Sequence, residues 1–226
     1  MISENIHFLP FVRGSTLDRY LAAGWYRIYD FVFTTDSISV GSSLFTVEWL
    51  RYELEKFEPT RRAAKLLKRN ERVFSICYRG GTLTGEHELL YERYRLGVDL
   101  ELAPTARQSL YAGEPSEIFE SRVIELRLKR RLVGAGFFDV GDDSAAGILN
   151  IYDPEFKKYS PGKFLMLLAM RYALRSGRKY FYPGYISRDY PKFDYKLFAG
   201  TRGAEIYDRS ANRWIPIERW PVVNRF

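Results

Sequence analysis

The final third of the chain constrains the fold most strongly, because four regular elements follow one another there with short connections. Residues 132–140 and 145–152 are apolar runs that predict two buried strands. A Ser-Pro-Gly-Lys turn at residues 160–163 opens a helix that stops at Gly177. Residues 179–186 then predict another strand. Strands that enclose a helix in this way predict a mixed α/β sheet.

The rest of the chain predicts further elements that add to this sheet. Helices are expected at residues 16–23, 60–70 and 84–96, strands at 25–33, 73–78 and 118–128, and an irregular loop at 104–115. Residues 40–50 fit a strand or a helix equally well. No Gly/Ser-rich linker interrupts the sequence, so we expect no freely mobile pair of domains.

Composition excludes several classes of protein. With 226 residues, 46% of them hydrophobic, the chain can form a packed core. Its single cysteine, Cys77, excludes an internal disulfide and a multi-cysteine metal site, and we expect neither a metal nor a cofactor. The two histidines, His7 and His87, lie near no Ser, Cys or Asp motif of a nucleophilic triad. No apolar run approaches the ~20 residues that span a bilayer, so we expect a cytoplasmic protein without a membrane partner.

A helix with six basic side chains is the strongest charge feature. Residues 61–72 contain one acidic residue, Glu71, against these six. A helix face that is only solvated usually carries both positively and negatively charged side chains. The six are Arg61, Arg62, Lys65, Lys68, Arg69 and Arg72. A phosphate-binding face and a solvated face both remain open on this pattern alone. The excess of 35 basic over 28 acidic residues suits a polyanionic partner such as RNA without requiring one.

Several segments resemble the aminoacyl-tRNA–protein transferases, the arginyl and leucyl transferases that cap protein N-termini. The run P-T-R-R-A-A-K-L-L-K-R-N at residues 59–70 is similar to the P-S-R-S-Q-R-R-V-L-R-R-N segment of the bacterial enzymes. Residues 21–27 resemble their L-L-x-x-G-W-R stretch, and residues 139–164 their D-V-x-D-D, F-F-D-P and S-L-G-x-Y elements. The most specific similarities are Y-P-G-Y-I at residues 182–186 and K-F-D-Y-K at residues 192–196, which resemble Y-x-G-Y-x-I and K-M-x-Y-K.

The resemblance implies a GNAT-like (acetyltransferase-like) α/β fold, in which helices flank a mixed sheet. We expect an N-terminal subdomain with the basic helix at residues 1–75 and an acyl-transfer domain at residues 76–226. The implied activity moves Arg or Leu from aminoacyl-tRNA to the α-amine of an acidic N-terminal residue, as in the N-degron pathway. The partners would be aminoacyl-tRNA and a protein or peptide N-terminus.

The same resemblance implies roles for individual residues. Asp153, Tyr182 or Tyr185 would handle the amine proton, with Tyr152 as a further tyrosine candidate. The six basic side chains of the helix would hold the tRNA, with an affinity that falls as salt rises. The expected substrate-binding residues are Ser160, Gly162, Gly184, Lys192, Tyr195 and Lys196.

Two alternatives remain open, and the sequence departs from the family in one respect. A GNAT-fold acyltransferase that uses acyl-CoA is one alternative, although the glycine-rich acyl-CoA signature is missing; a non-catalytic relative that binds tRNA or peptide is the other. The transferases carry a C-x-x-C motif in their N-terminal half, whereas residues 34–44 contain no cysteine. Pro161 and Pro183 also stand where the family motifs have other residues. The sequence therefore does not identify which N-terminal residue accepts the aminoacyl group.

Overall fold

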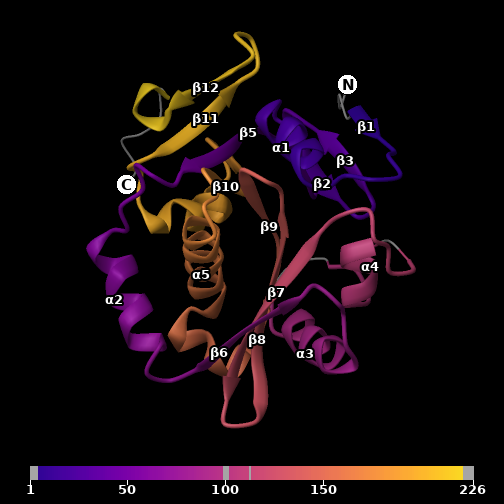
Figure 1. The fold of residues 1–226 in the computed structure, drawn as a ribbon, viewed down its shortest axis with the longest axis vertical. Coiled ribbons are helices and arrows are strands. Elements are labelled where there is room, and N and C mark those ends of the chain that lie inside the picture. The colour runs from indigo at the N-terminus through magenta and orange to yellow at the C-terminus, as the bar shows by residue number, and fades with distance from the viewer. Residues whose placement is uncertain (1–4, 99–101, 112, 221–226) are drawn as a thin grey trace.

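The computed structural model describes residues 5–98, 102–111 and 113–220, and folds them into two sheets with helices around the larger one (Figure 1). The strands are β1 (Asn5–His7), β2 (Tyr26–Ile28), β3 (Phe31–Thr34), β4 (Ser37–Val40), β5 (Ser43–Glu53), β6 (Ser75–Gly80), β7 (Ser121–Leu128), β8 (Arg131–Val140), β9 (Ser144–Tyr152), β10 (Tyr180–Ser187), β11 (Ala204–Asp208) and β12 (Arg213–Pro216). The α-helices are α1 (Ser15–Ala22), α2 (Arg61–Asn70), α3 (Gly85–Leu96), α4 (Ala106–Tyr111) and α5 (Pro161–Arg175), and the 3₁₀ helices are η1 (Pro154–Tyr159), η2 (Pro191–Ala199) and η3 (Ile217–Arg219).

The larger sheet is mixed, as the sequence predicts. Its strand order is β12-β11-β5-β10-β9-β8-β7-β6, with β4 paired to β5 at the side. β9 and β10 are parallel, because α5 connects them as a crossover, and the other neighbouring strands are antiparallel. β1, β3 and β2 form a separate three-stranded sheet.

Three apolar cores pack against the larger sheet. β8 contributes to two of them, because successive side chains of a strand point to opposite faces and a register shift against β7 at Val133 changes the phase of this alternation. Val133 and Phe138 pack in the core formed with α2 and α5, whereas Leu132 and Phe137 pack in the core formed with α3 and α4. Figure 1 shows α2 and α5 on one side of the sheet and α3 and α4 on the other. The sheet is therefore covered on both faces, which explains the nearly continuous apolar run of β8.

The central helix α5 begins and ends where its sequence predicts. Pro161 occupies the first turn, where its missing N–H costs no helical hydrogen bond, and Gly177 follows the last turn with a φ of +80°. Nine of its fifteen residues are buried, which matches its position against the sheet. None of the helices in the described part of the chain is long and apolar enough to cross a bilayer.

β9 and β10 separate partway along their length, and this fork positions the candidate site. Three residue pairs join them, the last being Ala146 with Tyr182, and both strands continue beyond it. The Tyr26 hydroxyl from β2 lies at the fork, where it is hydrogen-bonded to the carbonyl oxygens of Gly147 and, at 2.9 Å, Tyr182. On the other edge of β10 the register against β5 shifts before Gly184, whose φ is +99°.

Some expected elements differ from those observed. The single strand expected at residues 25–33 is two strands, β2 and β3, because a turn at Tyr29 with a φ of +53° folds the segment back on itself. The loop expected at residues 104–115 contains α4; Leu110 and Tyr111 of this helix pack on the sheet, and this long-range packing has no local signal. Residue 112 of that loop lies outside the described residues. Residues 40–50 lie in the β4–β5 hairpin.

The expected division between residues 75 and 76 stays a prediction. β5 comes from the N-terminal side of this boundary, yet it pairs with both β10 and β11 in the larger sheet. The three-stranded sheet comes entirely from residues before the boundary.

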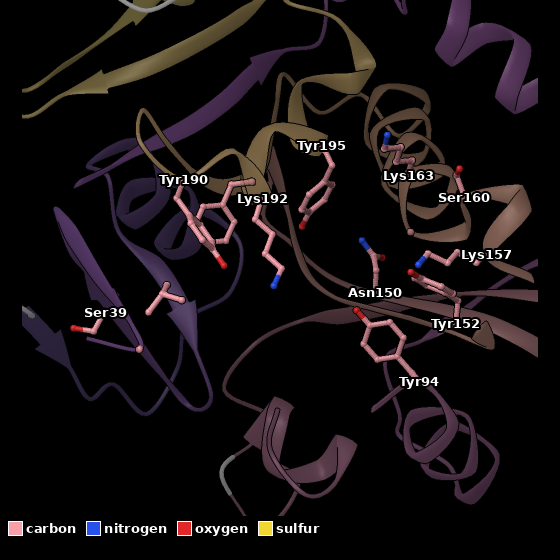
Figure 2. Close-up of a pocket in the computed structure, with 14 residues that line it drawn as sticks. Ser39, Tyr94, Asn150, Tyr152, Lys157, Ser160, Lys163, Tyr190, Lys192 and Tyr195 are labelled. Carbon is pink, nitrogen blue, oxygen red and sulfur yellow. The ribbon is translucent and has the colours of Figure 1, made fainter. Parts of the chain in front are cut away.

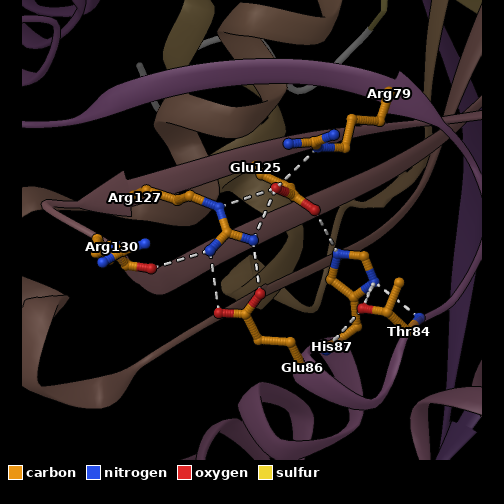
Figure 3. A network of polar contacts seen from close by, with 7 residues as sticks. All are labelled: Arg79, Thr84, Glu86, His87, Glu125, Arg127 and Arg130. Carbon is orange, nitrogen blue, oxygen red and sulfur yellow. Dashed lines mark hydrogen bonds and ion pairs between the residues drawn. The ribbon is translucent and has the colours of Figure 1, made fainter.

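A network of polar contacts fixes the start of α3 against the larger sheet (Figure 3). The Thr84 side chain caps the helix, and its backbone N–H donates to Nδ1 of His87 at 3.1 Å. His87 is buried, and its Nε2 lies 3.2 Å from a carboxylate oxygen of Glu125 on β7. Arg127 bridges Glu125 and Glu86, at 3.0 and 2.6 Å, and its hydrogen bonds lower the pKa of Glu86. This anchoring fixes α3 and, with it, the tyrosine that α3 contributes to the candidate site.

Candidate active site

Two adjoining cavities lie where β9 and β10 separate. The outer cavity has a volume of about 730 Å³ and the inner cavity about 350 Å³. Tyr94 of α3, Asn150 of β9 and Tyr195 of η2 line both, so the two cavities share part of their walls. Figure 2 shows these three side chains between the β4–β5 hairpin and the start of α5. The outer cavity alone is thus built from five separate parts of the chain.

Lysines and aromatic rings line the outer cavity. Lys157 of η1, Lys163 of α5 and Lys192 of η2 contribute positive charge, and no carboxylate occurs among the described residues of its wall. The Lys163 ammonium lies 4.5 Å from the ring centroid of Phe198, a cation–π contact that orients it. The aromatic side chains of the wall are Tyr94, Tyr152, Tyr190, Phe193 and Tyr195. Such a wall suits an anionic ligand that carries a flat ring.

The wall of the inner cavity combines apolar side chains with polar groups, two of which are positively charged side chains. Its apolar lining residues include Phe137, Leu149, Met166, Ala169 and Phe181. Arg27 of β2 and Lys196 of η2 are the charged side chains among the described lining residues. A side chain that enters this cavity therefore meets hydrocarbon and positive charge.

Arg27 is neutralised by a buried carboxylate. Its Nη1 lies 2.9 Å from Asp139 Oδ1, and its other nitrogens donate to the carbonyl oxygens of Tyr29 and Leu110 at 2.7 and 2.8 Å. The guanidinium lies 4.4 Å from the ring centroid of Phe119. Desolvation raises the pKa of Asp139 although Arg27 acts in the opposite direction. Arg27 is thus held rigidly by three elements of the fold.

Lys196, by contrast, is buried without an ion pair among the described residues. Its Nζ donates a hydrogen bond to the carbonyl oxygen of Tyr185 at 2.6 Å, and 7% of the residue is exposed. Burial disfavours the charged amine and lowers the pKa of Lys196 to about 7. Both the neutral and the charged amine are therefore accessible near neutral pH.

Three tyrosines of the two cavities, Tyr94, Tyr185 and Tyr195, stay protonated at neutral pH. Burial raises the pKa of Tyr94 to about 12, and the pKa values of Tyr185 and Tyr195 shift in the same direction. Their hydroxyl groups can consequently donate hydrogen bonds to a ligand. Across the described residues, no three His, Cys, Asp or Glu side chains gather where they could hold a metal ion.

The structure brings the expected substrate-binding residues together. Ser160, Gly162 and Lys192 line the outer cavity, Gly184 and Lys196 line the inner cavity, and Tyr195 lines both. These positions come from β10, η2 and the turn before α5, which the fold brings to one place. Their individual roles stay predictions.

The three residues expected to handle a proton have different surroundings. Tyr185 lines the inner cavity. Tyr182 is buried and points away from it, because its ring packs against Trp214 of β12 at a centroid distance of 5.5 Å. Asp153 is also buried and outside both walls; its carboxylate caps η1 and forms ion pairs with Arg93 and Arg131. This geometry gives Asp153 a structural role.

The five basic side chains of α2 and that of Arg72, two residues after its end, are all exposed. No ion pair to any of them is found in the described part of the chain, so their charge is available to a partner. The end of α2 contacts η1, because Asn70 Nδ2 donates to Tyr159 O at 2.7 Å and Arg69 donates to Lys158 O at 3.4 Å. η1 also carries Lys157 of the outer cavity. The basic helix therefore contacts the 3₁₀ helix that supplies Lys157 to the outer cavity.

Sequence reasoning missed several residues of the walls. Tyr94 and Asn150 reach the site only through the packing of α3 and β9, so no local motif marks them. Lys157 and Lys163 flank the Ser-Pro-Gly turn, and the density of basic residues around that turn was a usable signal.

Comparison with known proteins identifies the family of this chain. Residues 86–200 match the family described as "Arginine-tRNA-protein transferase, C terminus". The aspartate/glutamate leucyltransferase of Leptospira interrogans (strain Fiocruz L1-130) is 29% identical over 220 residues, which cover 94% of this chain and 84% of that protein. The aspartate/glutamate leucyltransferase of Dinoroseobacter shibae is 30% identical over 183 residues, which cover 74% and 61%.

Solved structures share the fold at much lower sequence identity. FemX superposes with a TM-score of 0.50 at 10% identity, over 93% of this chain and 73% of FemX. The C-terminal domain of a putative lysylphosphatidylglycerol synthetase from Agrobacterium fabrum gives a TM-score of 0.52 at 18% identity, over 67% and 50%. The expected GNAT-like α/β fold is confirmed. Since the family match covers half of the sequence, this chain belongs to the arginine-tRNA-protein transferase family of aminoacyltransferases.

Proposed function

We propose that this protein transfers a leucyl group from leucyl-tRNA to the α-amine of an acidic N-terminal residue. The observation that carries the proposal is the pair of adjoining cavities at the β9–β10 fork, with lysines and aromatic rings in the outer wall and apolar side chains beside Arg27 and Lys196 in the inner wall. The ester of aminoacyl-tRNA is already activated, so catalysis requires mainly the positioning of amine and ester and a proton acceptor.

The outer cavity suits the 3′ end of a tRNA. Its volume of about 730 Å³ lies in the range of small-molecule and cofactor sites. The rings of Tyr152 and Tyr190 offer faces on which the terminal adenine can stack, at ~1–3 kcal/mol per base. Lys157 and Lys163 can neutralise the last phosphates. The basic face of α2 would then hold the acceptor stem.

The inner cavity suits the donated side chain. Its wall of Phe137, Leu149, Met166 and Phe181 can bury an isobutyl group. An arginyl group would instead bury a guanidinium, and the described lining residues include no carboxylate that could pair with it. Of the two donors expected from the sequence, the cavity therefore favours leucine, and the leucyltransferase relatives support the same choice.

The acceptor is proposed to enter through the outer cavity. Lys192 lies on the side of this cavity nearer the β4–β5 hairpin, opposite Lys163 and Ser160 (Figure 2). An acidic N-terminal side chain would gain a favourable electrostatic interaction there, whereas a basic one would be repelled. The acidic acceptors named for the relatives are consistent with this arrangement.

A transfer assay tests the proposal. The protein is incubated with tRNA charged with labelled Leu, Arg or Phe and with peptides that begin with Asp, Glu, Arg or Ala, and label on the peptide is measured. The expected result is label from leucyl-tRNA on the Asp and Glu peptides. Absence of label with every pair would refute the proposal, and transfer from arginyl-tRNA alone would refute the assigned donor.

A matched pair of variants on α5 links the activity to the outer cavity. Lys163→Gln removes a charge in the first turn, within the cavity wall, and Arg175→Gln removes one in the last turn, ~20 Å along the helix. We expect the first to raise the KM for leucyl-tRNA several-fold and the second to leave it unchanged. Equal effects would mean that general surface charge, and not the cavity, binds the tRNA end.

A further inference from the structure

Lys196 is a buried lysine in the wall of the inner cavity. Lys196 lies on η2, and Tyr52 of β5 fixes its backbone through a hydroxyl that lies 2.8 Å from Lys196 O and 2.9 Å from Gly200 O. A lysine so firmly held and so deeply buried is unusual, since the charged amine loses its hydration there. The sequence pattern had suggested a substrate-binding role for this residue.

The Lys196 amine sits in an aromatic cage. Its Nζ lies 4.8 Å from the ring centroid of Tyr185, 4.9 Å from that of Phe193 and 5.8 Å from that of Tyr195. The fourth side is Gly184, because a Cβ there would approach Nζ to 3.2 Å. The glycine thus leaves room for the amine at the cavity wall, next to the β9–β10 fork.

When the Lys196 amine is neutral, its nitrogen has a lone pair that can accept a proton. A single hydrogen bond, donated to Tyr185 O, holds Nζ in place. No carboxylate in the described part of the chain pairs with it, so nothing there locks it in the charged form. Its geometry is that of a group free to accept a proton from a ligand in the cavity.

We propose that Lys196 accepts the proton of the attacking α-amine and passes it to the ribose oxygen that leaves. This inference rests on the proposed aminoacyl transfer and assigns the proton acceptor that Asp153 cannot easily supply from its two ion pairs outside the cavity.

The other titratable groups of the inner cavity do not compete for this role. They are Tyr26 and Arg27 of β2, Tyr94 of α3, Tyr185 of β10 and Tyr195 of η2. Burial raises the pKa of every one of these tyrosines, and Arg27 is paired with Asp139. Lys196, with a pKa of about 7, is the described group of this wall that changes charge near neutrality.

The proposed step is balanced in atoms and charge. The neutral α-amine of the acceptor attacks the ester carbonyl carbon of leucyl-tRNA, so a C–N bond forms and the carbonyl oxygen becomes negative. The new ammonium then loses a proton to neutral Lys196. When the carbonyl re-forms, the C–O bond to the ribose breaks, and the Lys196 ammonium donates the proton to the leaving oxygen. The products are the extended peptide and free tRNA, and Lys196 returns to its neutral form.

Single-turnover kinetics test the role. Lys196→Arg keeps a long donor side chain but stays charged at every accessible pH, and Lys196→Met removes the amine at similar volume. We expect both variants to bind leucyl-tRNA like the wild type and to transfer leucine about 10²–10⁴-fold more slowly. The wild-type rate should show an inflection near pH 7, and the variants should retain only the ionisation of the acceptor amine near ~8.

A direct titration keeps the proposal falsifiable if the variants fold poorly. In protein labelled with ¹³C at lysine Cε, the Lys196 signal, assigned by its absence from Lys196→Arg, should titrate near pH 7, whereas exposed lysines titrate near ~10.4. A Lys196 signal that titrates with the others would overturn the inference. So would a Lys196→Arg variant with wild-type rate and pH profile. Absence of transfer by the wild type would instead refute the proposed function itself.

Discussion

The buried Arg27–Asp139 pair gives the sharpest stability prediction. Their side chains are 2% and 0% exposed, and Nη1 and Oδ1 are 2.9 Å apart. Replacing one member leaves the other as an unpaired buried charge, which costs about 3–5 kcal/mol. For a chain of this size each kcal/mol lowers the Tm by about 2–4 °C, so Arg27→Met or Asp139→Leu alone should lower it by about 6–20 °C.

The double variant tests the reasoning behind that magnitude. Desolvation raises the pKa of Asp139 despite the neighbouring guanidinium, so the charged pair is held at a cost. Combining Arg27→Met with Asp139→Leu removes both charges and leaves neutral partners unsatisfied, namely the Ser121 hydroxyl and carbonyl oxygens such as Leu110 O, at about 1–3 kcal/mol each. Urea unfolding should therefore show the double variant to be at least as stable as either single variant. Strictly additive losses would refute the argument.

Three further predictions follow from other parts of the structure. Burial lowers the pKa of His87, so the free energy of unfolding should fall as the pH drops below about 6.5, the ordinary pKa of histidine. The amide of His87→Gln can still complete the helix cap, so urea titrations of this variant should show a weaker loss of stability at acidic pH. Replacing Lys65 and Lys68 with Ala should lower the slope of log Kd for tRNA against log salt by about 1.5, measured by filter binding, and Arg175→Ala should leave it unchanged if the basic helix binds phosphate. Gly184→Ala should cost about 1–3 kcal/mol in urea because its φ is +99°, and a neutral effect would contradict the assigned strain.

The elements marked by local chemistry were predictable from the sequence. Thr60 and Thr84 were expected near the starts of two helices, and both cap them through hydrogen bonds to the third residue that follows. The order from β8 to β10 was equally clear, because an α/β crossover has a strong pattern of apolar runs around a helix. These signals were sufficient to predict the fold class, and the six expected substrate-binding positions all lie in three motifs, at residues 160–163, 182–186 and 192–196.

Features that depend on distant packing were not predictable. α4 is short and gains its stability from contacts with the sheet, so its sequence looked like a loop. Lys192 and Lys196 are four residues apart in one motif, and the sequence does not distinguish their environments. The fold exposes the first and buries the second, because η2 turns one side toward β10. Asp153 also depends on distant packing, because its two ion pairs come from Arg93 and Arg131, which lie 60 and 22 residues away in the sequence.

The phenol of Tyr26 ties the fork to the small N-terminal sheet. Where β9 and β10 part, this one hydroxyl contacts a carbonyl on each strand, in place of the backbone N–H that a neighbouring strand would supply. The width at which the two strands diverge is therefore determined by a residue more than a hundred positions upstream of both. Substitutions in the β2–β3 hairpin that shift Tyr26 can in this way widen or narrow the space between the two strands.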